Sequence, residues 1–198
     1  QFLEQVYNCY MDRFYIEETQ ECITQQEYMN EAAREQFLKR FAIAEPHPDT
    51  DDRSRAASWE SLVHMEIEQE DKSLLGFCVL GGIFSEGIDL KGESLIGAII
   101  VGTGLPQVCF ERELLKDYFN AEGKNGFDFA YRYPGMNKVL QAAGRVVRTP
   151  QDKGVVLLLD DRFAQPDTAR LFPPHWQHIR YLPGTAALEA ALKGFWDV

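Results

Sequence analysis

Residues 136–159, MNKVLQAAGRVVRTPQDKGVVLLL, join a helical pattern directly to an apolar, strand-like run. Apolar side chains recur through the first half at the three- and four-residue spacing of a helix that buries one face. The run Val155–Leu159 shows no alternation of apolar and polar residues, which is typical of a strand buried on both faces of a parallel sheet. A helix followed by such a strand predicts an α/β fold.

Two further apolar runs lie upstream, at residues 74–80 and 98–101, and because they also show no alternation we expect these strands to be buried on both faces as well. Helical patterns at residues 110–118 and 135–148 separate the last two runs. This alternation predicts a mostly parallel sheet flanked by helices, with ligands bound beyond the carboxyl ends of the strands.

The first third of the chain predicts two more helices. Apolar residues at helical spacing mark residues 2–14 and 30–41, and Asn30 is a suitable N-cap for the second. Residues 45–57 and 121–127 are expected to be flexible loops because they are polar and rich in turn residues. We expect residues 1–198 to form one domain. Because the chain opens at Gln1 on an apparent helix face, we interpret it as a piece of a longer protein.

Composition excludes some classes of protein. With 45% hydrophobic residues the chain can bury a core, yet no apolar run approaches the ~20 residues of a membrane span. The net charge of −11 comes mainly from the first 75 residues, which hold 17 of the 31 acidic and 7 of the 20 basic residues. The overall charge therefore does not exclude a nucleic-acid partner for the remainder.

One candidate site lies in residues 136–148, taken as a single helix. Gln141, Arg145 and Arg148 then share the face opposite the apolar stripe, and no acidic residue lies between Asp128 and Asp152 to pair with them. Two guanidinium groups and an amide suit a polyphosphate, and the neighbouring Gly144 would let a ligand approach the backbone closely. The alternative is a solvated helix face.

A second candidate is the loop GGIFSEGID, residues 81–89, directly after the first apolar run. Its glycines can expose N–H groups to an anion or ribose, while Ser85 and Asp89 add a hydroxyl and a carboxylate. The alternative is a tight strand-to-helix turn.

Other patterns carry no site. Gly102-Thr103-Gly104 lacks the third glycine of a dinucleotide fingerprint, and Gly123-Lys124 belongs to no complete phosphate-binding loop. His175 and His178 lack evident partner ligands, and the four cysteines are scattered, so we expect reduced thiols and no metal site. Since the Walker lysine is missing, the chain should not hydrolyse ATP unaided.

The two candidate sites together resemble the sequence motifs of a known family. Residues 82–90, GIFSEGIDL, and 141–148, QAAGRVVR, resemble motifs V and VI of the XPD/DinG-like branch of superfamily 2 DNA helicases. The resemblance is strong from Leu74 to Phe163 and looks closest to bacterial DinG-like members. It implies a RecA-like (P-loop NTPase-type) fold, namely the second motor domain, which has no Walker A motif.

The resemblance also implies roles for individual residues. Gln141, Arg145 and Arg148 would face the ATP phosphates, with Arg145 and Arg148 as candidate arginine fingers and Gly144 beside the nucleotide. The implied motif V roles are nucleotide contact for Gly87 and Asp89 and contact with the single-strand backbone for Ser85 and Glu86.

The cofactors and partners implied are those of a helicase motor. ATP with Mg²⁺ would be bound mainly by an N-terminal motor domain of the same protein, and hydrolysis would drive translocation on single-stranded DNA and unwinding in DNA repair or replication. Many relatives hold an iron–sulfur cluster in that other domain, so the cysteines here are not assigned to one. No membrane contact is expected, and the resemblance points to a bacterial cytoplasmic protein. The alternative is a non-hydrolysing nucleic-acid-binding or scaffold module of the same fold.

Two departures limit this resemblance. Leu90 stands where eukaryotic relatives usually have Phe, and motif IV would end just before Gln1.

Overall fold

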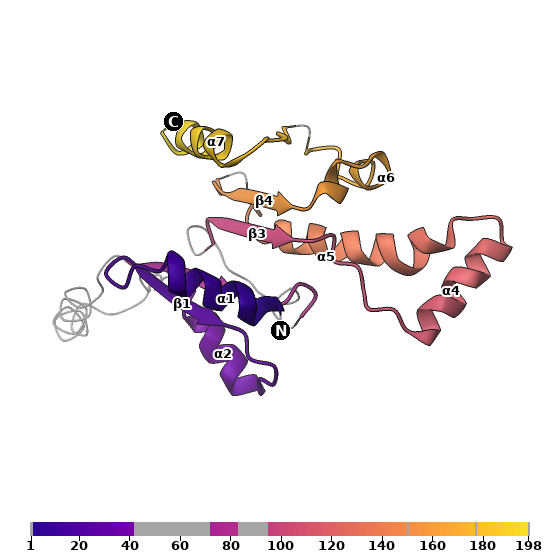
Figure 1. Cartoon of the computed structure of the whole chain (residues 1–198), viewed down its shortest axis with the longest axis horizontal. Coiled ribbons are helices and arrows are strands. Elements are labelled where there is room, and N and C mark those ends of the chain that lie inside the picture. Colours follow the sequence, from indigo (N-terminus) through magenta and orange to yellow (C-terminus); the bar gives the residue numbers. More distant parts are fainter. Residues whose placement is uncertain (1, 42–71, 83–94, 150, 177, 198) are drawn as a thin grey trace, which may run out of the picture. The chain divides into compact units, whose positions relative to one another are not determined.

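The computed structural model describes residues 2–41, 72–82, 95–149, 151–176 and 178–197 (Figure 1). The elements, in chain order, are α1 (Phe2–Arg13), β1 (Gln20–Thr24), α2 (Glu31–Lys39), β2 (Ser73–Phe77), β3 (Gly97–Val101), α4 (Phe110–Ala121), the π-helix η2 (Asp128–Arg132), α5 (Tyr133–Ala143), β4 (Val155–Leu159), the 3₁₀ helix η3 (Asp161–Ala164), α6 (Pro166–Ala169) and α7 (Thr185–Trp196). Within these ranges no helix is both long and apolar enough to cross a bilayer.

The chain divides into two compact units. One comprises Gln1–Ile100 and Gln141–Leu157, and the other comprises Val101–Leu140 and Leu158–Val198. Three elements, β3, α5 and β4, run from one unit into the other along the chain.

The first unit contains a parallel pair of strands, β1 and β2, in register from Gln20 opposite Ser73 to Thr24 opposite Phe77. The rings of Tyr7 and Tyr10 on α1 lie 5.3 and 5.6 Å from that of Phe77. Phe41, just after α2, fills the space beside Gly76, where a Cβ would come within 2.5 Å of its ring. Because neighbouring strand residues point to opposite faces, α1 and Phe41 cover opposite faces of this pair.

The predicted helices of this unit are confirmed as α1 and α2. The Asn30 side chain caps α2 by accepting a hydrogen bond from the Ala33 N–H at 2.8 Å. The predicted strand at residues 74–80 is confirmed as β2 but ends at Phe77, which pairs with Thr24, the last residue of β1. Strand β1 was missed because its residues are mostly polar. The predicted loop at residues 45–57 lies outside the described residues.

The strands β3 and β4 form a second pair. The Val155 N–H donates to the Ile96 carbonyl at 3.0 Å, and the Gly102 N–H donates to the Leu159 carbonyl at 3.2 Å. These bonds advance in the same direction along both strands, so the pair is parallel, as the arrows in Figure 1 show. The segment that connects the two strands carries α4 and α5, as the alternating pattern predicted.

Burial along β3 differs from the expectation. Ile100 is 5% exposed, whereas Ile99 and Val101 are 65% and 49% exposed. The prediction that this strand is buried on both faces is wrong in the described structure. An apolar run shows which residues a strand tolerates, whereas other elements decide which of its faces is covered.

In the second unit, α4 packs beside η2 at the start of the α5 region. Arg112 donates to the Ala130 carbonyl at 2.8 Å, and the Tyr131 hydroxyl donates to Glu113 at 2.6 Å. A Cβ on Gly126 would lie 1.9 Å from the Lys116 carbonyl oxygen, so only glycine fits there.

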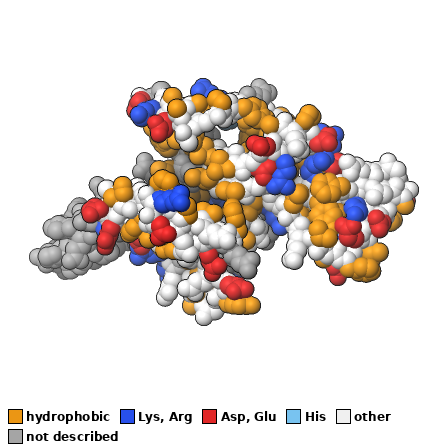
Figure 2. Space-filling model, in the orientation of Figure 1, with side chains coloured by type: hydrophobic (Ala, Val, Ile, Leu, Met, Phe, Trp, Pro, Cys, Tyr) orange, Lys and Arg blue, Asp and Glu red, His pale blue; other side chains and the backbone are white. Residues whose placement is uncertain are grey.

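The other side of α4 carries an exposed apolar stripe of Phe110, Leu114 and Tyr118, and hydrophobic side chains show on the surface around this helix (Figure 2). After α4, residues 122–125 form an exposed turn, and the Lys124 N–H donates to the Phe119 carbonyl at 2.9 Å. The flexibility of residues 121–127 stays a prediction.

Helix α5 carries the core of this unit, where Met136 and Val139 are almost completely buried. Gly135 lets the helix lie against the backbone of the turn after β3, because a Cβ there would be 2.6 Å from the Thr103 carbonyl oxygen. In that turn Gly102 and Gly104 have φ of +83° and +67°. The Gly-Thr-Gly sequence therefore serves a close packing contact.

Candidate functional site

The segment predicted to carry the site begins in the last turn of α5, which ends at Ala143. Beyond it the Arg145 N–H donates to the Ala142 carbonyl at 3.1 Å and the Val146 N–H to the Ala143 carbonyl at 3.2 Å. These are the tighter bonds of a 3₁₀-type turn, so the prediction of one helix through Arg148 is wrong past Ala143.

Burial of Val146 accounts for this early end. Val146 is 2% exposed, and its Cγ1 lies 2.4 Å from where a Cβ on Gly154 would be. The 3₁₀-type turn directs the Val146 side chain inward, and Gly154, which has no side chain, leaves room for it.

The predicted residues consequently do not share one helix face. Gln141 lies exposed on the last turn of α5, Gly144 is exposed in the turn, and Arg145 and Arg148 are half-buried beyond the helix. Both arginines contact other groups of the protein. What the structure brings together is a short, partly exposed segment of two guanidinium groups, an amide and a glycine.

Asp152 holds the far end of this segment. Its Oδ2 accepts hydrogen bonds from the backbone N–H groups of Arg148 and Thr149, both at 2.8 Å, and its Oδ1 accepts from the Thr149 hydroxyl at 2.9 Å. The Arg148 and Thr149 N–H bonds lower the pKa of the Asp152 carboxyl, and the Arg148 charge lowers it further.

Sequence reasoning missed Asp152 as a functional neighbour. The stretch without acidic residues ends at Asp152, which lies only four residues after Arg148. A carboxylate that follows a predicted helix end by a few residues is the signal that could have revealed such a cap.

The carboxyl end of β4 carries a second ordered polar group. Asp160 accepts two hydrogen bonds from the Arg162 guanidinium, at 2.8 and 2.7 Å, and one from the Arg162 N–H at 2.9 Å. The Arg162 side chain lowers the pKa of the Asp160 carboxyl. Because this carboxylate begins η3 as its N-cap, the pair first of all fixes the turn after the strand.

At the ends of β1 and β2, the Gln25 side chain joins the two strands. Its Oε1 accepts from the Val79 N–H at 3.0 Å, and its backbone N–H donates to the Phe77 carbonyl at 2.8 Å. This contact lies just before the second candidate loop, residues 81–89. The loop residues Ser85, Glu86, Gly87 and Asp89 lie outside the described residues.

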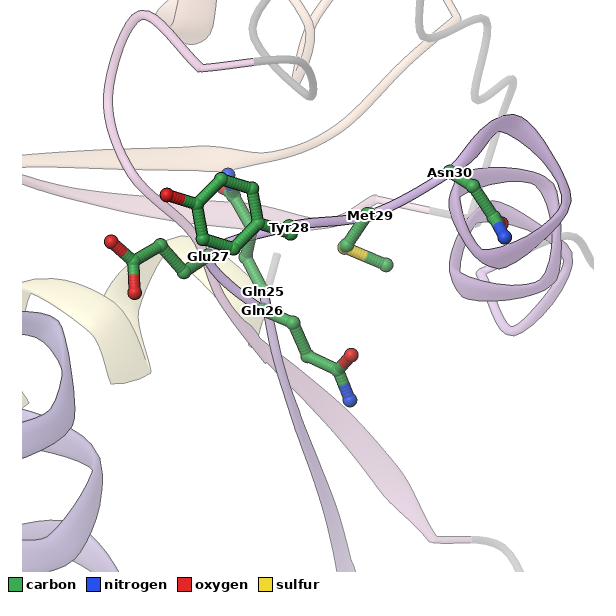
Figure 3. Close-up of a pocket in the computed structure, with 6 residues that line it drawn as sticks. All are labelled: Gln25, Gln26, Glu27, Tyr28, Met29 and Asn30. Atoms are coloured by element: carbon green, nitrogen blue, oxygen red, sulfur yellow. The ribbon is translucent and has the colours of Figure 1, made fainter.

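A surface hollow of about 480 Å³ follows β1 and is lined by residues 25–30 (Figure 3). Its walls come from one continuous stretch of chain, and Tyr28 is 87% exposed. In Figure 3 the side chain of Gln26 points away from the ring of Tyr28. The hollow contains none of the predicted site residues.

Within the described ranges, no three His, Cys, Asp or Glu side chains gather in an arrangement that could hold a metal ion. All four cysteines are free thiols. The side-chain donors at the end of α5 are guanidinium and amide groups, which fit phosphate oxygens and not a cation.

A comparison with known protein families identifies the family of this chain. A family model described as "Helicase C-terminal domain" matches residues 1–179. The chain belongs to this family. The fold class predicted from the sequence, α/β with parallel strands, is confirmed.

Relatives of this helicase C-terminal domain come from several groups of organisms. It is 29% identical over 108 residues to a probable ATP-dependent helicase of Methanocaldococcus jannaschii, covering 50% of this chain and 17% of that protein. It is 37% identical over 113 residues to the human regulator of telomere elongation helicase 1, covering 52% and 9%. It is 37% identical over 83 residues to the ATP-dependent DNA helicase DinG of Photobacterium profundum, covering 41% and 12%.

The chain therefore corresponds to a small part of each of these proteins. A solved XPD helicase structure is similar with a TM-score of 0.44 and 19% identity, covering 85% of this chain and 29% of that one. Because archaeal, animal and bacterial relatives match at similar identity, special closeness to bacterial DinG-like members stays a prediction.

Proposed function

We propose that this helicase C-terminal domain is the second motor domain of an ATP-dependent DNA helicase. In this proposal residues 1–198 form one RecA-like domain, and its arginines complete an ATP site begun by a first motor domain of the parent protein. The observation that carries the proposal is the segment 141–148, QAAGRVVR, which leaves α5 with two guanidinium groups and an amide in a partly exposed turn. Such donors suit a polyphosphate better than they suit a buried structural role.

Within the site, Arg148 and Arg145 are the candidates for an arginine finger. Phosphoryl transfer depends on positioning and charge stabilisation, and such a finger contributes about 10³ to 10⁵ in rate. Gln141 would donate its amide to a phosphate oxygen or to the attacking water. The exposed Gly144 would let the nucleotide approach the backbone, where a Cβ would stand in its way.

Motif V would connect the nucleotide to DNA. Gly87 and Asp89 are proposed to lie near the nucleotide, and Ser85 and Glu86 near the single-strand backbone. This assignment is supported by the motif itself and by its place after β2, since ligands in parallel sheets bind beyond the carboxyl ends of the strands.

The other components of the proposed helicase belong to the rest of the parent protein. ATP and Mg²⁺ would be held mainly by the first motor domain, which would also carry any iron–sulfur cluster. The partners are that domain and single-stranded DNA, in repair or replication, and the bacterial cytoplasm is the proposed location. Relatives named ATP-dependent DNA helicases support this reading.

The test is ATP hydrolysis by the full-length parent, with and without single-stranded DNA, for wild type and Arg148→Ala. We expect DNA-stimulated turnover that falls at least about 10³-fold in the variant while ATP still binds. Arg180→Ala, which removes an exposed arginine outside the segment, should leave turnover unchanged.

Two outcomes would contradict parts of the proposal. If the wild type does not hydrolyse ATP, the motor function is wrong and a nucleic-acid-binding or scaffold module of the same fold takes its place. If Arg148→Ala remains fully active, the motor function stands and the finger is wrongly assigned.

A further inference from the structure

Asp152 makes an unusual set of contacts for a residue outside the helicase motifs. One of its carboxylate oxygens accepts the backbone N–H groups of both Arg148 and Thr149, and the other accepts the Thr149 hydroxyl. Resting on the proposed function, we infer that Asp152 is a positioning residue that fixes the backbone of Arg148 and thereby the direction from which this arginine reaches the nucleotide.

Arg148 needs such an anchor because it lies beyond the hydrogen bonds of α5. The helix ends at Ala143, and the 3₁₀-type bonds that follow it reach only as far as Val146. A finger residue has to be held within a fraction of an ångström of its productive position, and a long side chain on a mobile backbone does not meet that requirement.

The anchor is itself tied to the sheet. The Asp152 N–H donates to the Thr149 carbonyl at 3.1 Å, which closes the loop on itself. Three residues later, Val155 begins β4 and donates to the Ile96 carbonyl at 3.0 Å. Asp152 therefore connects the segment that carries Arg148 to the paired strands.

The contacts of Asp152 are those of a residue that aligns the backbone of Arg148, rather than of a residue that only pairs with its charge. Both backbone N–H groups converge on the same oxygen, a geometry that fixes the main chain and that an ion pair with the guanidinium alone would not require. These N–H groups are also the leading causes of the lowered pKa of Asp152. An asparagine could keep the acceptor oxygen without the charge.

The experiment compares wild-type parent protein with Asp152→Ala, Asp152→Asn and Thr149→Val. We expect Asp152→Ala to lower kcat about 10²-fold, with KM for ATP and Kd for single-stranded DNA changed no more than about threefold. Asp152→Asn should stay within about threefold of wild type because its amide oxygen can accept both N–H groups. Thr149→Val, which removes only the hydroxyl bond, should behave like wild type.

A double variant tests whether Asp152 acts through Arg148. In an Arg148→Ala background, Asp152→Ala should lower kcat no further, because the group it positions is gone. A further drop of about 10²-fold, or an Asp152→Asn enzyme as impaired as Asp152→Ala, would overturn the inference. If Asp152→Ala does not fold, Asp152→Ser, whose side chain is too short to keep both bonds in place, takes its position in the same comparison.

Failure of this inference is distinct from failure of the proposed function. An inactive wild type contradicts the helicase motor itself. An active wild type whose kcat is unchanged by Asp152→Ala contradicts only the positioning role.

Discussion

Helix α5 and the segment that follows it are held in place by different forces. The helix is fixed by shape, because Met136 and Val139 are buried and Gly135 brings it against the backbone of the turn after β3. In the segment after it Val146 is buried, whereas Arg148 and Thr149 are held by hydrogen bonds to the Asp152 carboxylate. Packing resists any change of volume, whereas a few directional bonds fix one backbone and leave its neighbours accessible.

This contrast suits the motor role proposed for the domain. A rigid helix provides a platform, and the segment at its end leaves Arg145 and Arg148 half-buried and Gln141 exposed. Substitutions at the buried positions of α5 should therefore act on stability, and substitutions of Gly144, Arg148 and Asp152 should act on nucleotide binding or turnover. The predictions below test this division, from the largest expected effect to the smallest.

The largest effect on stability is expected from Asp128→Ala, in the π-helix η2 that leads directly into α5. This carboxylate is 4% exposed and pairs with Arg132 and with Arg170, the latter at 3.1 Å. Its removal takes from both arginines the buried carboxylate that they share, leaving them only the exposed Asp167, and should lower the free energy of unfolding by about 3 kcal/mol. Chemical denaturation provides the measurement, and kcat of the folded protein should not change.

Asp167→Ala is the matched control, because Asp167 belongs to the same cluster but is 55% exposed. It should cost less than about 1 kcal/mol. Equal losses for the two variants would show that burial does not decide the strength of this cluster.

Gly135→Ala tests the close contact of α5. The added Cβ would lie 2.6 Å from a backbone oxygen that cannot move alone, so we expect a loss of about 1–3 kcal/mol in spite of the better helix propensity of alanine. Gly194→Ala in α7, where nothing lies within 4 Å of the new Cβ, should instead gain up to about 1 kcal/mol. A neutral Gly135→Ala in thermal or chemical denaturation would refute the idea that shape fixes this helix.

Gly144→Ala probes the polar segment. Because position 144 is exposed and lies beyond the helix, the substitution should change the free energy of unfolding of the protein by no more than about 0.5 kcal/mol. If the nucleotide approaches the backbone here, KM for ATP should rise about tenfold, equivalent to about 1.4 kcal/mol. Steady-state kinetics and a melting curve on the same sample separate the two effects; an unchanged KM would count against a role of Gly144 in binding.

The smallest effect at neutral pH concerns the titration of Asp152. Its pKa in the folded protein lies below the ordinary value of 3.8, so the stability contributed by the carboxylate is present above that value and is lost as the pH falls through the lowered pKa. Backbone amide chemical shifts of Arg148 and Thr149 should therefore titrate only below about pH 3.8. Asp152→Asn should abolish this transition, and a transition that persists in the variant would assign it to another group.

The sequence by itself determined the features that depend on local pattern. Periodicity placed α1, α2 and α4, and the apolar runs placed β2, β3 and β4, because a helix or strand with a buried face must repeat apolar residues at its own period. The two motif sequences, residues 82–90 and 141–148, by themselves pointed to the helicase family. The same local reasoning missed β1, whose polar residues pair with Ser73–Phe77 from more than fifty positions away.

Only the tertiary structure decided where α5 ends and what holds Arg148. Periodicity carried the helix through Arg148, but burial of Val146 against the glycine before β4 ends it at Ala143. The two hydrogen bonds that the Arg148 and Thr149 N–H groups donate to the Asp152 carboxylate then replace the helical bonds that the sequence had suggested. The physical reason is that a helix end costs little in local propensity, so the energy of one buried side chain and one well-placed cap is enough to move it.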